Sequence, residues 1–388
     1  MSMTISDTNE NPQKDAANKS TKGGLEGVVA ATTAISKVEG TAGRLIYRGY
    51  NIHDLTRTTS FEEVANLLWF GHLPNKEELL DLKVRLLADR TMPDAILRIL
   101  SDLPATTEPM DALRTATSAW GAMSIKGKPA IEQAIAVTTR FPVFLAAFHR
   151  MRNGLQPLES HPELGHAANY LYLLSGKIPE EQHVKALDAY LVLLADHGMN
   201  ASTFTARVVA STESDIVSAV VAAIGALKGP LHGGAPSKVQ DMLKAIGTIE
   251  NAENWLRNAL ARGERLMGFG HRVYKTEDPR AEELRDLAHL ADPQEFVLAR
   301  RVEELALALL KERKPDQRLN TNVEFYSAVL LASVGLPGDL FTPTFATSRV
   351  AGWTAHILEQ VANNRLIRPE ADYTGPNETR FLAIDERV

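Results

Sequence analysis

Three histidines stand beside glycine or other small residues, where an imidazole could exchange a proton with a ligand. They are His197 in ADHGMN, His232 in GPLHGG and His271 in GFGHRV. Glycine beside a functional side chain lets ligand and backbone approach closely, and imidazole is well suited to move protons near neutral pH. Each has a structural alternative. His197 follows two leucines on an apolar face, where a satisfied core histidine is the commoner explanation, and His232 could equally fill a loop.

A fourth candidate is Glu324, which lies in the apolar segment NVEFYS. Burial disfavours the charged form of a carboxylate, so this setting would raise its pKa toward that of a useful general base. A surface glutamate is the alternative. A histidine metal site is not expected, because no two histidines share a helix at the spacing that ligands require.

Arginines could hold the carboxylates of an anionic ligand. Asp278, Pro279 and Arg280 fit the N-cap and first two positions of a helix. Arg280 would then lie at the positive helix end, beside free backbone N–H groups, which suits a carboxylate receptor. A solvated arginine is the alternative. Arg349 and Arg368 are not marked by spacing alone.

Gly268 and Gly270 resemble the start of a phosphate-binding glycine loop. The third glycine of that pattern is missing and no strong strand precedes it. The pattern is therefore weak support for a nucleotide site.

The elements that must position these residues are mostly helices. From Phe61 onward helical periodicity recurs and alternating β-branched runs are scarce, which predicts an all-α chain. Ser60 and Glu63 have the spacing of a capping box, so a helix should begin there and end near Gly71. A second helix is marked by apolar residues at i, i+3, i+4 and i+7, namely Leu187, Tyr190, Leu191 and Leu194.

One or two small β-hairpins are expected in 25–51, where apolar β-branched residues are interrupted by glycines. Glycine and proline signals at 229–236 and 337–338 predict boundaries between two lobes. The larger helical domain would combine 25–232 with 342–388, and the smaller one would span 233–341.

The amino-acid composition limits the classes of binding partner and the kinds of site that are expected. The 388 residues carry 42 basic and 48 acidic side chains, a net charge of −6, so no global positive field favours nucleic acid or an anionic membrane. Cysteine is absent, which excludes disulfides, thiolate metal sites and a cysteine nucleophile, and a reducing cytoplasm is the expected location. Residues 1–24 are polar, without the pattern of a secretory or mitochondrial signal, and are expected to be a disordered tail.

From about Gly24 to the C-terminus, the chain resembles one family, the citrate synthases, in the residues of its motifs and in their order. The resemblance is to the short type I form that lacks an N-terminal NADH-binding domain. Six separated motifs in the family's order carry it: YRGYNIHDL at 47–55, ADHGMNAST at 195–203, GPLHGG at 229–234, GFGHRVYKTEDPR at 268–280, NVEFYS at 322–327 and SRVAGW at 348–353.

The resemblance implies an all-α, two-domain citrate synthase-like fold and an acyltransferase that condenses acetyl-coenzyme A with oxaloacetate. In the family, the residue matching Glu324 removes a methyl proton from acetyl-coenzyme A. The residue matching His232 donates a hydrogen bond to the thioester carbonyl. The residue matching His271 protonates the keto oxygen of oxaloacetate, and the citryl thioester is then hydrolysed to citrate.

The same resemblance implies the binding residues. Arg280, Arg349 and Arg368 would hold the carboxylates of oxaloacetate with help from His197, and Arg368 would come from the partner subunit of a homodimer. Coenzyme A would be contacted by four positions: Lys275, Arg318, Gly268 and Gly270. No permanently bound cofactor is implied, since acetyl-coenzyme A is a co-substrate.

Two residues depart from the usual family pattern. Glu324 stands where most members have aspartate, which displaces the carboxylate by about 1.3 Å unless the backbone retreats. Gly198 stands where an acidic residue is more usual, which should alter the hydrogen bonding around His197.

Two alternatives remain open at this point. A 2-methylcitrate synthase would use propionyl-coenzyme A, and a pocket discriminates one methylene by only about 1 to 3 kcal/mol. A non-catalytic helical scaffold would have no physical reason to keep two histidines and a carboxylate together.

Overall fold

The structure is a computed structural model that describes residues 24, 25, 27–233, 235–271, 273–291, 293–317 and 319–387. Contacts divide the chain into two units, 1–34 and 35–388. Most of the residues expected to form the tail, 1–23, lie outside the described residues. In the first unit, the described part has a turn in which the N–H of Val28 donates to the carbonyl of Leu25 at 3.1 Å.

The second unit holds all the regular elements of the described residues, which are α-helices apart from three short strands and two 3-10 turns. In chain order they are β1 Ser36–Glu39, β2 Arg44–Tyr47, β3 Tyr50–Asn51, α1 Ile52–Thr58, α2 Phe61–Phe70, α3 Lys76–Ala88, α4 Asp94–Ser101, α5 Pro109–Ser124, α6 Ala130–Arg152, α7 His166–Ser175, α8 Glu181–Leu194, α9 Ala201–Ser211, α10 Ile216–Lys228, α11 Ala235–Ile246, α12 Ile249–Ala261, α13 Pro279–Ala291, α14 Pro293–Arg313, α15 Val323–Ser333, η1 Gly338–Leu340, α16 Phe341–Ala362 and η2 Ile384–Glu386. The predicted all-α class is therefore confirmed.

The three strands form an antiparallel sheet in the order β1-β2-β3, as the glycine-interrupted segment predicted. Ser36 pairs with Tyr47, and Tyr47 pairs in turn with Tyr50. Leu45 and Tyr47 are fully buried, because alternate residues of a strand point to the same face. The sheet thereby holds Ser36 and Tyr47 against the end of α8, where the hydroxyl of Tyr47 donates to the carbonyl of Asp196 at 2.7 Å.

Both helices singled out in the sequence are confirmed. Ser60 caps α2, its side chain accepts from the N–H of Glu63, and the Glu63 carboxylate accepts from the N–H of Ser60 in return. The helix ends at Gly71, which takes a left-handed conformation with φ of 87°. The apolar stripe of α8 is fully buried.

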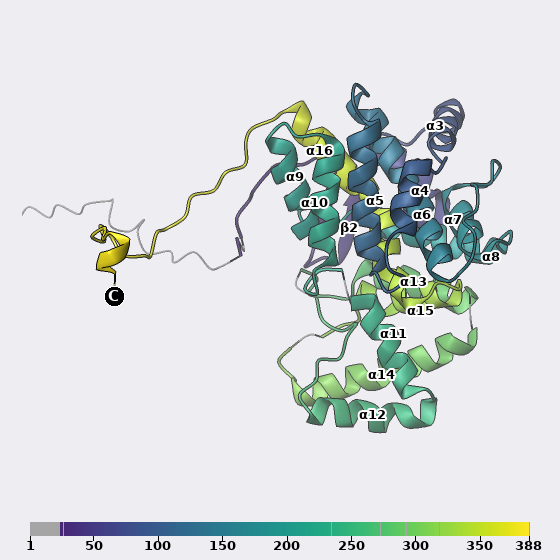
Figure 1. Cartoon of the computed structure of the whole chain (residues 1–388). Helices are drawn as coiled ribbons and strands as arrows, with labels where there is room; N and C mark the ends of the chain where they lie inside the picture. Colours follow the sequence, from purple (N-terminus) through teal and green to yellow (C-terminus); the bar gives the residue numbers. More distant parts are fainter. Residues whose placement is uncertain are drawn as a thin grey trace, which may run out of the picture. The chain divides into compact units, whose positions relative to one another are not determined.

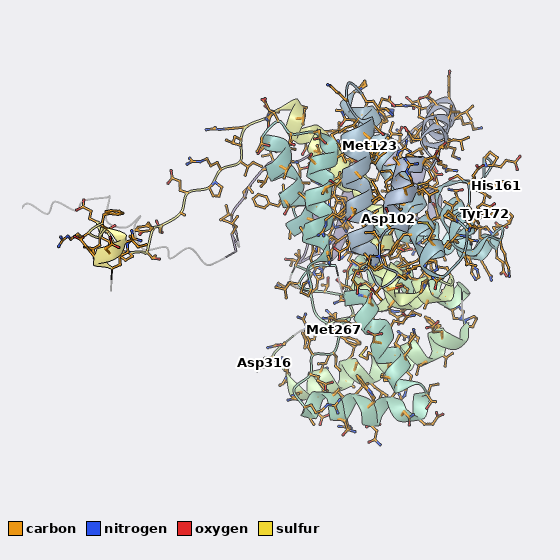
Figure 2. The ribbon with its side chains drawn as sticks, in the orientation of Figure 1. Asp102, Met123, His161, Tyr172, Met267 and Asp316 are labelled. Atoms are coloured by element: carbon orange, nitrogen blue, oxygen red, sulfur yellow. The ribbon has the colours of Figure 1, made fainter. Side chains whose placement is uncertain are left out.

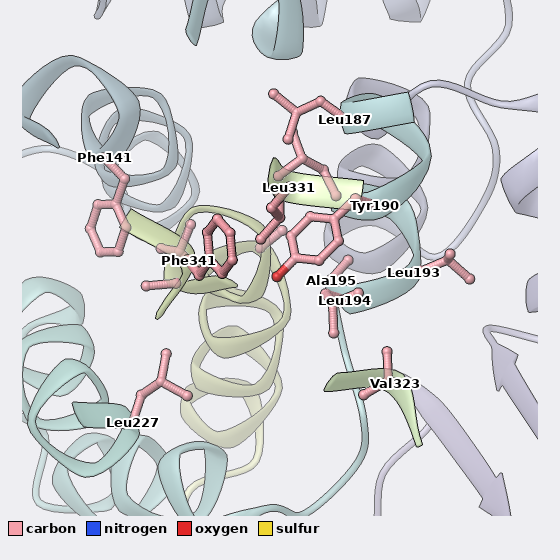
Figure 3. Close-up of a cluster of buried hydrophobic side chains, with 14 of the residues drawn as sticks. Phe141, Leu187, Tyr190, Leu193, Leu194, Ala195, Leu227, Val323, Leu331 and Phe341 are labelled. Atoms are coloured by element: carbon pink, nitrogen blue, oxygen red, sulfur yellow. The ribbon is translucent and has the colours of Figure 1, made fainter. Parts of the chain in front are cut away.

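Core packing fixes the starting points of three segments that carry candidate residues (Figure 3). Ala195 ends the α8 region just before His197, and Leu227 closes α10 before the loop that holds His232. Val323 begins α15 immediately before Glu324. Ala195 and Leu227 are 0% exposed and Val323 is 4% exposed. Each of the three segments therefore begins at a residue that is fixed in the close-packed core.

Helix α6 contains Pro142 and is the one helix in the described ranges that is long and apolar enough to cross a membrane. Of its apolar window, 83% is buried inside the protein, as in a core helix. It packs against α5, α7 and α16.

Farther along the chain, α12 lies beside α14 and α13 packs on α15 (Figure 1). This group of helices falls within the predicted smaller domain, 233–341. The proposed division into two domains stays a prediction.

Candidate active site

Three rings meet where the turn after α8 approaches the loop before α13. The ring centroids of His197 and His271 are 5.8 Å apart, and that of Tyr274 lies 4.7 Å from His271. Nε2 of His197 is 3.1 Å from the hydroxyl of Tyr274. Two of the sequence candidates, 74 positions apart along the chain, therefore lie in one cluster.

The backbone of the same loop sets the tautomer of His271. Its Nδ1 accepts from the N–H groups of Val273 at 3.0 Å and Tyr274 at 2.9 Å. In the neutral ring the proton must therefore be on Nε2, which lies 4.0 Å from Oδ2 of Asp278. Burial, and then the charge of Arg280, lowers the pKa of His271 to about 4. At neutral pH it is a neutral ring with a proton to donate.

His232 is held by the first turn of α9. Its Nε2 accepts from the N–H of Ser202 at 3.3 Å and is 2.8 Å from the Ser202 hydroxyl. That hydroxyl in turn accepts from the indole N–H of Trp353 at 3.0 Å. Since Nε2 is an acceptor, the neutral ring carries its proton on Nδ1. Burial, and then Arg349, lowers the pKa of His232 to about 4.

Glu324 lies in the first turn of α15. Burial raises the pKa of this carboxyl above its usual value, although the charge of Arg280 opposes the rise. Its Oε2 is buried and has no hydrogen-bond partner among the described residues. Asn322 caps the helix, accepting from the N–H of Glu324 at 3.1 Å while its amide donates to the carbonyl of Gly270 at 2.9 Å. The direction of this pKa shift agrees with the prediction, but the charges of Arg280 and Asp278 also act on the carboxyl, so its surroundings are not wholly apolar.

Arg280 begins α13 with Asp278, as the sequence predicted, since its backbone N–H donates to Oδ1 of Asp278 at 3.0 Å. The guanidinium itself is not free. Its Nε and Nη2 pair with the same carboxylate at 3.0 and 2.8 Å. Burial is the largest single influence and lowers the pKa of Arg280, but the charge and hydrogen bonds of Asp278, with smaller contributions from Tyr274 and Glu324, together raise that pKa.

Arg349, in α16, is 1% exposed. Its Nε donates to the carbonyl of Leu194 at 2.7 Å, whereas Nη2 is buried with no partner in the described part of the chain. Burial lowers the pKa of Arg349 to about 10, and the charge of Asp196 only partly offsets this. An unsatisfied buried guanidinium nitrogen is costly and is suited to an anionic ligand.

The two guanidinium groups link these side chains electrostatically. After burial, the charge of Arg280 is the next largest influence that lowers the pKa of His197 and of His271. The charge of Arg349 is the next largest influence that lowers the pKa of His232, and it also lowers the pKa of His197. Such coupling requires proximity. We call the following set the candidate site: His197, His232, His271, Arg280, Glu324 and Arg349.

Sequence reasoning missed the residues that support the turn carrying His197. Asp196 is fully buried. Its carboxylate accepts hydrogen bonds from the N–H of Gly198 at 2.9 Å and from the hydroxyl of Ser36. Nε2 of His356 lies 3.2 Å from its other oxygen, off the line of a good hydrogen bond. Gly198 has a left-handed backbone conformation, with φ of 58°, and its N–H donates to Asp196. The adjacency of Asp196 to His197 was the available signal, but its partners are distant in sequence.

The positions expected to contact coenzyme A are only partly described. Gly268 and Gly270 have φ of 87° and 81°, and a Cβ on Gly268 would lie 2.8 Å from Phe325. Lys275 is exposed. Arg318 lies outside the described residues. Figure 2 labels Met267 and Asp316, which stand in the loops that lead to the two glycines and to Glu324.

Arg368 is exposed, in the segment after α16, and no contact with the candidate site is found for it in this single chain. No group of three or more His, Asp or Glu side chains placed to hold a metal occurs within the described ranges.

The family described as citrate synthase, C-terminal domain, matches residues 24–370. The chain belongs to the citrate synthase family. It is accordingly an enzyme that transfers an acyl group by condensation.

Named members of the citrate synthase family extend the comparison. Citrate synthase 2 of Bacillus subtilis is 45% identical over 376 residues, covering 94% of this chain and 99% of that protein. The 2-methylcitrate synthase of Mycobacterium tuberculosis is 42% identical and covers 93% of this chain and 92% of its own. The solved citrate synthase of Thermoplasma acidophilum, in a ternary complex with carboxymethyl coenzyme A and oxaloacetate, is 31% identical, with a TM-score of 0.87 over 94% of this chain and 98% of that one.

Proposed function

We propose that this chain condenses acetyl-coenzyme A with oxaloacetate at the candidate site and hydrolyses citryl-coenzyme A to citrate and coenzyme A. The carboxylate of Glu324 takes a proton from the acetyl methyl group. Nδ1–H of His232 donates to the thioester oxygen as the enol forms, so that charge does not accumulate in a site with little water.

The enol carbon then attacks the keto carbon of oxaloacetate. His271 gives its Nε2 proton to the keto oxygen as the carbon–carbon bond closes, and water later cleaves the thioester. Arg280 and Arg349 hold the carboxylates of oxaloacetate, with His197 beside them. For Arg280 this requires sharing its guanidinium with Asp278, because only part of it is available.

The observation that carries the proposal is the state of Glu324. Its carboxyl has a raised pKa, and its Oε2 is buried without a partner among the described residues, which is costly unless the site uses it. The two neutral histidines beside the guanidinium groups complete an acid–base set.

Glu324→Gln tests the assignment of the base. We expect kcat to fall by about 10³-fold or more, because acid–base groups supply roughly 10²- to 10⁴-fold and an amide cannot accept the proton. Oxaloacetate affinity, measured by calorimetry, should stay within about 3-fold, since Glu324 does not hold that substrate. An equal loss of turnover and of oxaloacetate binding would contradict this assignment.

A 2-methylcitrate synthase is the second candidate, favoured by the 42% identity to the mycobacterial enzyme of that name. We expect acetyl-coenzyme A to give a kcat/KM at least about 10-fold higher than propionyl-coenzyme A, which is the scale of discrimination for one methylene. The ratio measured with saturating oxaloacetate decides between them, and a preference for propionyl-coenzyme A would reverse the choice.

We also propose a cytoplasmic homodimer in which Arg368 of one subunit completes the oxaloacetate site of the other. The exposure of Arg368 in its own chain and the unpartnered nitrogen of Arg349 support this. Lys275 and Arg318 would bind the phosphates of coenzyme A, and Gly268 and Gly270 would contact the same ligand. A solution mass of 42.5 kDa, that of one chain, would contradict the dimer.

A further inference from the structure

Glu303 of α14 is a carboxylate that the proposed chemistry does not use. Its side chain is 2% exposed, and four donors surround it. Oε1 accepts from the hydroxyl of Thr321 at 2.6 Å and from Arg285 at 3.0 Å. Oε2 accepts from the hydroxyl of Tyr326 at 2.5 Å and from Arg300 at 2.5 Å. A carboxylate with two donors on each oxygen has little capacity left for a ligand.

Two of these donors bracket Glu324 in the sequence. Thr321 precedes it by three residues and Tyr326 follows it by two. One carboxylate therefore holds both ends of the turn that presents the proposed base.

The same segment is joined to the loop of His271. Thr321 forms an antiparallel bridge with Phe269, and the N–H of Gly270 donates to the carbonyl of Asn320 at 2.7 Å. His271 follows directly. The position of this loop relative to the Glu324 turn thus depends on backbone atoms that Glu303 anchors through Thr321.

A third connection runs through Arg285. Besides Glu303 it pairs with Glu277, the residue before Asp278, and its guanidinium carbon lies 5.0 Å from the ring centroid of Tyr326. Glu303 is therefore linked to the segments that carry the proposed base, the proposed acid and Arg280.

We propose that Glu303 is a positioning residue that fixes the carboxylate of Glu324 relative to the ring of His271. The proposal rests on the roles given above to these two residues. Misplacement of a reacting group by about 1 Å can cost about 10²-fold in rate, so loss of this anchor should appear in kcat rather than in substrate binding.

Glu303→Gln is the principal test, because it preserves shape but removes the charge and turns one acceptor into a donor that faces donors. We expect kcat, per mole of folded protein, to fall about 10- to 100-fold, with oxaloacetate affinity within about 3-fold. Glu304→Gln is the matched control. Glu304 is the next residue on α14, and its side chain is 55% exposed. Its ion pairs in the described part of the chain are with Arg300 at 3.5 Å, farther than the 2.5 Å between Arg300 and Glu303, and with Arg301 at 3.8 Å, so the kcat of this variant should stay within about 2-fold.

Tyr326→Phe and Thr321→Val supply a second arm that leaves Glu303 itself in place, in case Glu303→Gln does not fold. Each should lower kcat by about 3- to 10-fold, with melting temperature recorded alongside. If Glu303 acts through Tyr326, the effects of Glu303→Gln and Tyr326→Phe on kcat should be non-additive in a double-mutant cycle.

The outcomes separate this proposal from the one on which it rests. An inactive Glu324→Gln together with normal kcat in Glu303→Gln, or in both second-arm variants, would overturn the positioning role alone. Strictly additive effects in the cycle would overturn the part of the role that runs through Tyr326. An active Glu324→Gln would instead overturn the assignment of the base.

Discussion

Two regions of the second unit hold titratable groups away from water, and they differ in what those groups contact. One is the candidate site. The other, which we call the helix-capping cluster, consists of Glu62, Asp188 and His166. Burial, and then the nearby Glu62, raises the pKa of Asp188, while burial lowers the pKa of His166 to about 3. By pKa alone the two regions look alike.

Hydrogen bonding separates them. Both oxygens of Asp188 lie 3.3 Å from the N–H of Phe61, the first residue of α2. Glu62 accepts from the N–H of His166, the first residue of α7, at 2.9 Å. These carboxylates are used at helix N-termini, where donors are otherwise unpaired.

In the candidate site, by contrast, a carboxylate oxygen of Glu324 and a guanidinium nitrogen of Arg349 are buried without partners among the described residues. In the helix-capping cluster only Nε2 of His166 is in that state. Perturbed pKa values mark burial, whereas buried charged groups left without partners favour a place for a ligand.

The strongest test of this contrast is Arg349→Gln. We expect the KM for oxaloacetate to rise by roughly 100-fold or more, because removing one partner of a desolvated charge pair costs about 2 to 5 kcal/mol. Steady-state kinetics measures it. Arg90→Gln is the control, since Arg90 is also buried but donates to the carbonyl of Leu164 at 2.6 Å and should leave KM unchanged. If both variants leave KM unchanged, the unpartnered nitrogen of Arg349 does not mark a binding site.

The pH dependence of turnover gives an effect of intermediate size. Glu324 must be ionised to act as a base, and its folded pKa is raised above 4.5. Activity should be lost as pH falls through that pKa, by about 10-fold per unit below it. His232 and His271, with pKa values lowered to about 4, stay neutral over this range. A kcat/KM profile that begins to fall only below pH 4 would contradict the raised pKa of Glu324.

Asp188→Asn should have the smallest kinetic effect, with kcat/KM within about 2-fold and the free energy of unfolding near neutral pH changed by about 1 kcal/mol or less. The sign of its pH effect is fixed by linkage. A raised folded pKa contributes stability below the unfolded value of 3.8, and that contribution is lost as pH rises through the folded pKa. The free energy of unfolding, measured with urea, should therefore fall less toward alkaline pH in the variant than in the parent protein. A large fall in kcat/KM would place Asp188 in the catalytic apparatus.

Local sequence rules predicted several features that the structure confirms. The capping box at Ser60 and Glu63, the end of that helix at Gly71 and the start of a helix at Asp278 all depend on neighbours within four residues. So does the apolar stripe of α8. These patterns succeed because backbone capping and helical periodicity are short-range.

Partnerships between distant residues were not predictable in this way. Trp353 supports Ser202 beside His232 across 151 positions, and nothing in either local sequence indicates the pair. Even for the neighbours Asp278 and Arg280, where a helix start was predicted, the ion pair between the guanidinium of Arg280 and the carboxylate of Asp278 was not predicted. Burial makes an internal ion pair preferable to an unpaired charge, and burial is a property of the whole fold.

From the sequence alone came the helical class, the candidate residues and, through six ordered motifs, the family, because these depend on residue types and their spacing. The tertiary structure decided which groups face one another, which carry their protons on which nitrogen and which are left without partners. Most of those properties arise from desolvation and from contacts between residues far apart in the chain, such as Ser36 and Asp196, which are 160 positions apart. The tautomer of His271 is an exception, because the N–H groups of its own loop set it.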